Sequence, residues 1–287
     1  MNFKQFVKKY FPKLFNNSGP MRNYINKKFR SEYIKINIIK EFFEYSPNVT
    51  GTISGRSKNT IFSIKNYSPV LNSLIEQPLR QQDIDDITPT NESHLLKELF
   101  QKYKSDKATH NYHLVYAKYL NQQKIKNLLE IGLGTNNTEI MSNMSKLGNP
   151  GASLFAFRDF LPQSEIWGAD IDEKILFQDK NINTLYLDQL DKISIQDFVT
   201  KFSFKFDVII DDGFHSIISN INSIFIAKNI LVENGLLIIE DIRLDNLPLL
   251  NVAINLVEGD FEAKIYKNPN MAVAVLKKIK WLINTKY

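Results

Sequence analysis

The second half of the sequence alternates short apolar runs with stretches of helical periodicity, and this alternation limits the possible folds more than any other feature. From residue 127 onward, runs such as NLLEIG, EIWGAD and FDVIIDD are separated by segments such as ASLFAFRDFL and SIISNINSIFIAKNIL. Buried strands joined by crossover helices are typical of a parallel sheet with both faces covered. The pattern therefore predicts a doubly wound, mostly parallel α/β sheet of seven strands.

The last two apolar runs depart from this alternation. FEAKIYK and MAVAVLKK are separated only by NPN, which is a turn sequence. A connection this short joins antiparallel strands, because a parallel crossover needs many more residues. We expect the sheet to end in a C-terminal antiparallel hairpin.

Residues 1–92 lack the alternating pattern, and we interpret them as a mainly helical accessory region before a catalytic domain over 93–287. The net charge of +5 arises in this region, because the first 30 residues contain eight lysines and arginines and no acid. The remaining chain has no excess of basic residues, so a nucleic-acid partner is not favoured. Aromatic residues at three- and four-residue spacing predict an amphipathic helix in the first stretch. The alternatives that stay open are peripheral contact with acidic lipid or another polyanion, docking on the same protein chain, and docking on a second subunit of a homo-oligomer.

Three absences limit the class of protein further. The sequence contains no cysteine, which excludes disulfides, thiolate metal sites and a cysteine nucleophile. It contains neither a signal-peptide pattern nor eighteen consecutive apolar residues, so we expect no membrane span. A cytoplasmic protein is the expectation.

Polar residues and glycines follow three successive predicted strands. The first strand ends in Glu130-Ile-Gly-Leu-Gly134, the second in Asp170 and the third in Asp188-Gln189. Doubly wound sheets bind small molecules at the carboxyl ends of their strands. Glycine lets the backbone approach a ligand, an aspartate can accept both hydroxyls of a ribose, and an amide can read an adenine edge. A tight turn and an exposed acid are the alternatives for any one of these positions, but three together favour a cofactor site.

Carboxylates also end the next two strands. Asp211-Asp212 follows the fourth strand and Glu240-Asp241 the fifth, and neighbouring strands lie about 4.8 Å apart. Asp212, Glu240 and Asp241 are therefore candidate ligands of Mg²⁺, which prefers oxygen donors. His215 follows at the same crevice and is the candidate general base, because imidazole is suited to take a proton from a hydroxyl near neutral pH. The alternative is that His215 caps the following helix while the acids face solvent.

The polar loop SDKATHNY precedes the first strand and lies between two predicted helices in residues 91–120. We expect Ser105-Asp106-Lys107 and His110-Asn111-Tyr112 to fold over the cofactor or the acceptor as a lid. An ordinary connecting loop is the alternative.

The motifs KYKSDKATHNY, NPGASLFAFRDFLP, WGADIDE, LDQ, IIDDGFH and IIEDI together resemble the class I S-adenosylmethionine-dependent methyltransferases, over about residues 95–278. More narrowly, they resemble the subgroup of macrocin and mycinamicin sugar O-methyltransferases. The resemblance implies a Rossmann-like fold, S-adenosyl-L-methionine as methyl donor, Mg²⁺, and a small-molecule or saccharide acceptor with a reacting hydroxyl. It also implies the metal and base roles given above for Asp212, Glu240, Asp241 and His215.

The predicted cofactor-binding residues are Glu130, Gly132, Gly134, Ser153, Asp170, Asp188, Gln189, Asp211, Ser105 and Lys107. One departure from the pattern is a polar insert over residues 135–151, between the glycine motif and the following helix.

Three other functions compete with this interpretation. A nucleic-acid methyltransferase could use the basic arm, but DDGFH replaces the Asn/Asp-Pro-Pro-aromatic sequence that base N-methyltransferases use. A non-catalytic scaffold would not need both the carboxylates and the histidine. A nicotinamide-dependent enzyme is disfavoured because no G-x-G-x-x-G follows the first strand.

Overall fold

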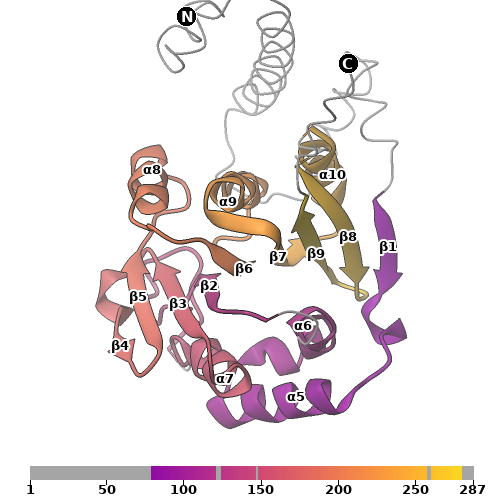
Figure 1. The fold of residues 1–287 in the computed structure, drawn as a ribbon, viewed down its shortest axis with the longest axis horizontal. Coiled ribbons are helices and arrows are strands. Elements are labelled where there is room, and N and C mark those ends of the chain that lie inside the picture. The colour runs from indigo at the N-terminus through magenta and orange to yellow at the C-terminus, as the bar shows by residue number, and fades with distance from the viewer. Residues whose placement is uncertain (1–78, 121–123, 147, 257–259, 280–287) are drawn as a thin grey trace, which may run out of the picture. The chain divides into compact units, whose positions relative to one another are not determined.

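A computed structural model describes residues 79–120, 124–146, 148–256 and 260–279, all within the unit spanning residues 61–287. These residues form one nine-stranded sheet with the order β1-β8-β9-β7-β6-β2-β3-β5-β4 (Figure 1). Its strands are β1 (Arg80–Asp83), β2 (Asn127–Ile131), β3 (Glu165–Asp170), β4 (Gln178–Asp179), β5 (Ile182–Tyr186), β6 (Phe206–Asp211), β7 (Leu231–Arg243), β8 (Phe261–Lys267) and β9 (Met271–Lys278). The doubly wound α/β class predicted from the alternating pattern is confirmed.

The pairing directions follow from the lengths of the connections. β5, β3, β2, β6 and β7 are mutually parallel, whereas β9 pairs antiparallel with both β7 and β8. α-Helices connect β2 to β3, β5 to β6 and β6 to β7, but a 3₁₀ turn and β4 connect β3 to β5. The C-terminal hairpin expected from NPN is therefore present. Two short edge strands extend the seven expected ones: β1 pairs parallel with β8, and β4 pairs antiparallel with β5. Four and two residues are too short for a periodicity argument to detect.

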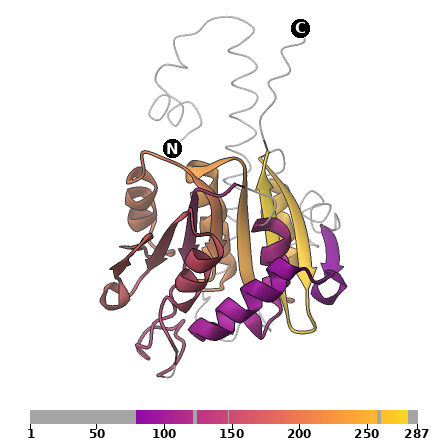
Figure 2. The ribbon, with the colours of Figure 1, turned by 60° about the horizontal axis from the view of Figure 1, so that its bottom comes forward.

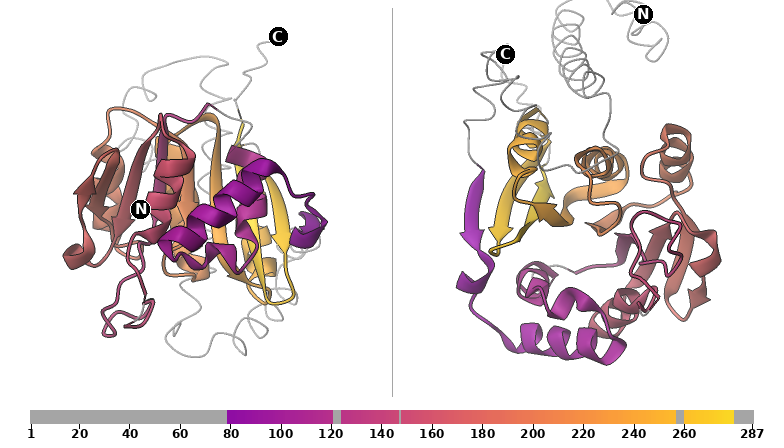
Figure 3. Two further views of the ribbon diagram at one scale, coloured as in Figure 1. Left: turned by 90° about the horizontal axis from the view of Figure 1, so that it is seen from below. Right: turned by 180° about the vertical axis from the view of Figure 1, so that it is seen from behind.

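Helices cover both faces of the sheet. The helices are α5 (Asn91–Tyr103), α6 (Tyr112–Leu120), α7 (Ala152–Phe160), α8 (Lys192–Thr200), α9 (Ile217–Ile230) and α10 (Leu247–Leu256). In Figures 1 and 2, α5, α6 and α7 lie on one face, and α8, α9 and α10 lie on the other. Figure 3 shows the same two layers from below and from behind.

The central strands are buried because both faces are covered. All residues of β2 from Leu128 to Ile131 are buried, as are Val208 to Asp211 of β6. The face under α5, α6 and α7 is filled by aromatic rings, with Phe157 contacting Phe100 and Tyr116 at centroid distances of 5.4 and 5.2 Å. This packing fixes α6 against the carboxyl ends of the strands, where the polar residues lie.

Two expectations concern the N-terminal part of the chain. The N-terminal amphipathic helix and its membrane or subunit contacts lie outside the described residues. The division at residue 92 stays a prediction, although Arg80–Asp83 already belongs to the sheet. Among the described residues, no helix has the length and apolar character needed to cross a membrane.

Candidate active site

A cavity of about 710 Å³ lies at the carboxyl ends of β2, β3, β5, β6 and β7. Its volume is within the range of pockets that bind small molecules and cofactors. Eleven of the fourteen site residues predicted from the sequence line it, namely Ser105, Lys107, Gly132, Gly134, Ser153, Asp170, Asp188, Gln189, Asp212, His215 and Asp241. Glu130, Asp211 and Glu240 are at most 1% exposed and lie beneath the cavity wall.

The glycine motif brings the end of β2 against the end of β6. Gly132 has φ of 97°, and a Cβ atom at this position would lie 2.0 Å from the carbonyl oxygen of Asp212. Gly134 has φ of 77°, and a Cβ atom there would collide with the Met144 side chain. Both positions therefore require glycine, for the backbone conformation and for the close approach.

Asp170, at the end of β3, holds the loop that follows β2. Its two carboxylate oxygens accept hydrogen bonds from the backbone N–H groups of Leu133 and Asp172, at 2.7 and 2.9 Å. Burial raises the pKa of Asp170, and these backbone donors oppose the shift. Ile171 and Leu190 are exposed apolar residues that also line the cavity. They provide apolar surface beside Asp170 and Asp188, which the sequence reasoning did not single out because single apolar residues at strand ends carry no periodic signal.

Gln189 and Asp211 connect the loops after β5 and β6. Gln189 Nε2 donates to Asp211 Oδ1 at 2.7 Å and to Ser223 Oγ at 3.0 Å, and its Oε1 accepts from Phe214 N at 3.0 Å. Asp211 also accepts from Asn220 Nδ2 at 3.0 Å. The Gln189 amide therefore bonds mainly to protein groups, and its expected contact with an adenine edge stays a prediction.

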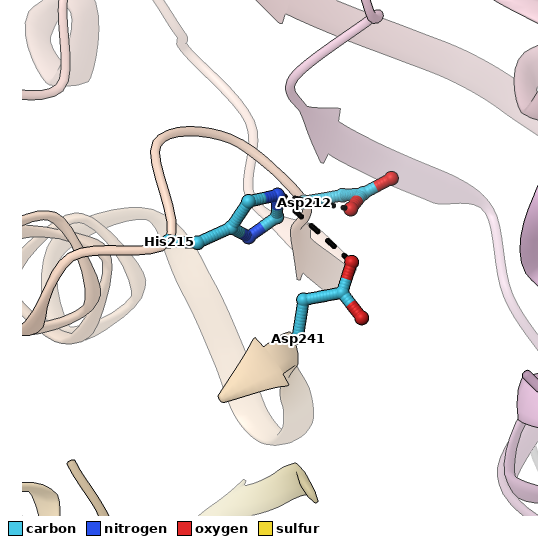
Figure 4. Close-up of side chains that lie close together, drawn as sticks. All are labelled: Asp212, His215 and Asp241. Carbon is cyan, nitrogen blue, oxygen red and sulfur yellow. Dashed lines mark ion pairs between the residues drawn. The ribbon is translucent and has the colours of Figure 1, made fainter. Parts of the chain in front are cut away.

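Asp212, His215 and Asp241 all line the cavity, and their side chains lie close together (Figure 4). His215 Nε2 lies 3.8 Å from Asp212 Oδ1 and 4.0 Å from Asp241 Oδ2. One ligand atom from each residue falls within 4.8 Å of the others, a spacing that suits a bound metal ion. The N-cap of α9 is Ser216, which forms a capping box with Ser219, so His215 is not the cap.

Unusual backbone conformations direct two of these side chains. His215 has φ of 54° and Asp241 φ of 50°, in the left-handed region that residues other than glycine seldom adopt. The pairing of β7 with β9 is irregular between Ile239 and Ile242, which brackets Asp241. β-Bulges and residues with a left-handed backbone conformation reorient side chains and are frequent next to functional sites. Backbone strain at His215 and Asp241 therefore points to a functional site.

Lys107 is the counter-ion of three carboxylates. It lies in the 3₁₀ turn η3 (Asp106–Ala108), is 2% exposed, and its Nζ is 3.1 Å from Glu130 Oε1 and 2.5 Å from Asp212 Oδ2. Glu240 Oε2 also accepts from this amine. Burial alone would lower the pKa of Lys107, but the three carboxylates together outweigh burial and raise it well above its ordinary value. Lys107 therefore contributes to the cavity lining and is held there by buried charge, and its role in a lid stays a prediction.

Two tyrosines on α6 complete the arrangement. Tyr116 Oη donates to Glu240 Oε1, and Tyr112 Oη donates to Asp241 Oδ1. The pKa of each phenol is raised, mainly by burial and secondly by the negative charge of the carboxylate to which it bonds. Sequence reasoning placed Tyr112 in the polar loop, whereas it is the first residue of α6. It missed Tyr116, although the four-residue spacing of the two tyrosines would have placed them on one helix face.

The insert over residues 135–151 forms part of the cavity wall. Its ends are joined by the hydrogen bond from Gly151 N to Leu133 O at 2.7 Å, and Met144 N bonds to Thr135 O at 2.9 Å. Ser142 Oγ donates to the carbonyl of Gly213 at 2.9 Å, in the loop that carries His215. Six consecutive insert residues, 139–144, line the cavity.

No family model and no curated protein matches this chain. Among solved structures, it is similar to the MycE methyltransferase from the mycinamycin biosynthetic pathway in complex with Mg and SAH. That match has 25% identity and a TM-score of 0.50, over 64% of this chain and 55% of the other. A second structure of MycE, with Mg, SAH and mycinamycin VI, matches at 19% identity with a TM-score of 0.52, over 82% and 63%. The chain thus spans less than two thirds of the length of these solved chains.

Proposed function

We propose that this chain, whose fold is that of the class I S-adenosylmethionine-dependent methyltransferases, transfers a methyl group from S-adenosylmethionine to a hydroxyl. The proposed acceptor is a small molecule or a saccharide, and the proposed compartment is the cytosol. One observation carries the proposal. Residues that the sequence predicted by their chemistry, at five strand ends and in a preceding loop, line a single cavity. The lining includes a cluster of two acids and an imidazole.

The cavity fits an S-adenosyl group in its volume and in its lining. Asp170 and Asp188 offer carboxylates toward ribose hydroxyls, and Ile171 and Leu190 offer apolar surface for a purine. Gly132 and Gly134 also line the cavity, and no side chain projects from either of them. When bound, the sulfonium of S-adenosylmethionine supplies the electrophilic methyl group.

The acid cluster fits a hard divalent cation such as Mg²⁺. Asp212 and Asp241 each direct a carboxylate toward His215, and no thiol competes for the ion. Glu240 is the third expected ligand, but its two oxygens bond to Lys107 and Tyr116, and only Asp212, His215 and Asp241 have ligand atoms that lie together among the described residues. Its role as a ligand stays a prediction. A bound cation would lower the pKa of an acceptor hydroxyl. MycE, described in complex with Mg and SAH, supports this part of the proposal.

His215 is the proposed general base. Its Nε2 is the imidazole nitrogen that faces both aspartates, and its side chain is 30% exposed, so an acceptor can reach it. With donor and acceptor bound, Nε2 would take the proton of the hydroxyl whose oxygen displaces S-adenosylhomocysteine from the methyl carbon, and Asp212 and Asp241 would stabilise the imidazolium that forms. The remaining contribution of the protein is to align donor and acceptor.

Binding and turnover test the proposal separately. Calorimetry with S-adenosylhomocysteine should show one binding site per chain. Asp170→Ala should weaken the affinity for S-adenosylhomocysteine, because the proposed contact with the ribose is lost. Methyl transfer to a panel of glycosides should require Mg²⁺ and fall about 10²- to 10⁴-fold in His215→Gln. His94→Gln, at an exposed histidine of α5 outside the cavity, is the matched control. Absence of S-adenosylhomocysteine binding by the wild-type protein would refute the proposed function.

A further inference from the structure

Helix α6 presents two phenols to adjacent acids of β7. Tyr112 and Tyr116 are one helical turn apart, and they bond to Asp241 and Glu240 respectively. Consecutive residues of a regular strand point to opposite faces of the sheet. Glu240 and Asp241 nevertheless both face α6. The strand is irregular at this point, since the pairing of β7 with β9 is interrupted and Asp241 has a positive φ.

The two oxygens of Asp241 have different partners. Oδ1 accepts from Tyr112, and Oδ2 lies 4.0 Å from His215 Nε2. Tyr112 is 1% exposed and belongs to the buried core, so its ring cannot move without disturbing its neighbours. The phenol therefore determines which oxygen of Asp241 faces the cavity.

Tyr112 donates this hydrogen bond as a neutral group, because an ordinary phenol keeps its proton at neutral pH. A hydrogen bond from a neutral donor holds the carboxylate without cancelling its charge. Lys107 differs in this respect, because its full positive charge offsets that of the acids it contacts.

We propose that Tyr112 is a positioning residue for the divalent-cation site, which acts by orienting Asp241. The inference rests on the proposed function, because it assumes that Asp241 is a ligand. Groups that hold a metal ligand through a hydrogen bond typically contribute 10- to 100-fold to metal affinity. Tyr112→Phe removes the hydroxyl and keeps the ring, so it tests this single bond.

The test is a titration of the full-length protein with Mn²⁺, followed by electron paramagnetic resonance, since carboxylate sites that suit Mg²⁺ also suit Mn²⁺. We expect Tyr112→Phe to weaken Mn²⁺ binding 10- to 100-fold and to change the affinity for S-adenosylhomocysteine less than twofold. Tyr119→Phe is the matched control. Tyr119 is on the same helix, and its hydroxyl bonds to that of Tyr266 at 2.9 Å, outside the cavity.

A double-substitution cycle separates positioning from a general loss of structure. Once Asp241→Asn has removed the charged ligand, Tyr112→Phe should weaken Mn²⁺ binding by less than threefold. The inference is wrong if Tyr112→Phe binds Mn²⁺ as Tyr119→Phe does, if the two substitutions act additively, or if the wild-type protein does not bind Mn²⁺. If the wild-type protein binds Mn²⁺ with the expected Tyr112 dependence but not S-adenosylhomocysteine, the proposed function fails and the inference stands.

Discussion

Lys107 illustrates how far the role of a residue depends on distant partners. The sequence predicts a cation in a loop near the cofactor, and the loop does reach the cavity. Its amine, however, contacts Asp212 and Glu240, which are 105 and 133 residues away in sequence. Local reasoning cannot predict such a contact, because the direction of a long flexible side chain is decided by the charges that surround it in the folded state.

Replacing Lys107 with methionine should destabilise the protein strongly. The substitution keeps an apolar side chain of similar length and leaves Glu130 and Glu240 buried without a cationic partner. Removing one partner of a buried ion pair typically costs about 3–5 kcal/mol. Urea unfolding followed by circular dichroism would measure this loss in the free energy of unfolding.

Lys102→Met is the control for Lys107→Met. Lys102 also contacts a carboxylate, that of Asp159 at 3.0 Å, but its side chain is 60% exposed. Exposed ion pairs contribute about 0–1 kcal/mol. If both substitutions cost the same, Lys107 would not be the counter-ion that its position indicates.

At the scale of elements, the insert over residues 135–151 is the segment whose structure the sequence does not predict. Its polar composition indicates a loop, and the structure adds that the loop returns on itself and contacts Gly213 through Ser142. The side chain of Met141 is 76% exposed at the cavity. A segment that covers part of a cavity in this way can control how long a ligand stays bound.

Ser142→Ala should weaken binding of S-adenosylhomocysteine by releasing this contact. A net contribution of about 0.5–1.5 kcal/mol per hydrogen bond corresponds to roughly a twofold to tenfold increase in Kd. Calorimetry gives the Kd, and stopped-flow fluorescence should show that most of the change is faster dissociation. Ser145→Ala, at an exposed serine of the same insert, should leave both quantities unchanged. An unaltered Kd in Ser142→Ala would mean that the insert does not hold the cofactor.

The longer elements were predictable because each carries a periodic pattern. β2, β3, β6 and β7 coincide with apolar runs, and α7 and α9 coincide with segments of helical spacing. The short strands β1 and β4 were not predictable, because their pairing depends on a neighbouring edge rather than on their own sequence.

At the scale of the whole molecule, the topology explains why the site could be outlined from the sequence. Parallel strands place their carboxyl ends on one edge of the sheet, so residues at strand ends converge whatever their separation in sequence. Asp170 and Asp212 line one cavity for this reason. Tyr112 reaches the same edge from a helix whose docking depends on tertiary packing, so topology alone does not predict its role.

The stability of the whole molecule should decrease as the pH decreases, because of His113 on α6, which is 5% exposed. Burial first, and then the nearby Lys97 and His94, lower the pKa of His113 to about 4. Its Nδ1 is buried without a hydrogen-bond partner among the described residues, which is consistent with a neutral ring. Between pH 6.5 and pH 4 the unfolded chain therefore binds a proton that the folded chain does not.

The free energy of unfolding should consequently decrease as pH falls through this window, with His113 contributing roughly 1–3 kcal/mol. His113→Gln cannot take up this proton, so urea unfolding from pH 7.5 to pH 4 should show a shallower loss of stability than in the wild type. Gln can also change the packing, but a packing effect is the same at every pH and does not alter the slope. His110→Gln, at an exposed histidine, should keep the wild-type slope. Equal slopes in wild type and His113→Gln would show that His113 takes up a proton equally well in the folded chain, contrary to the effect expected from its burial.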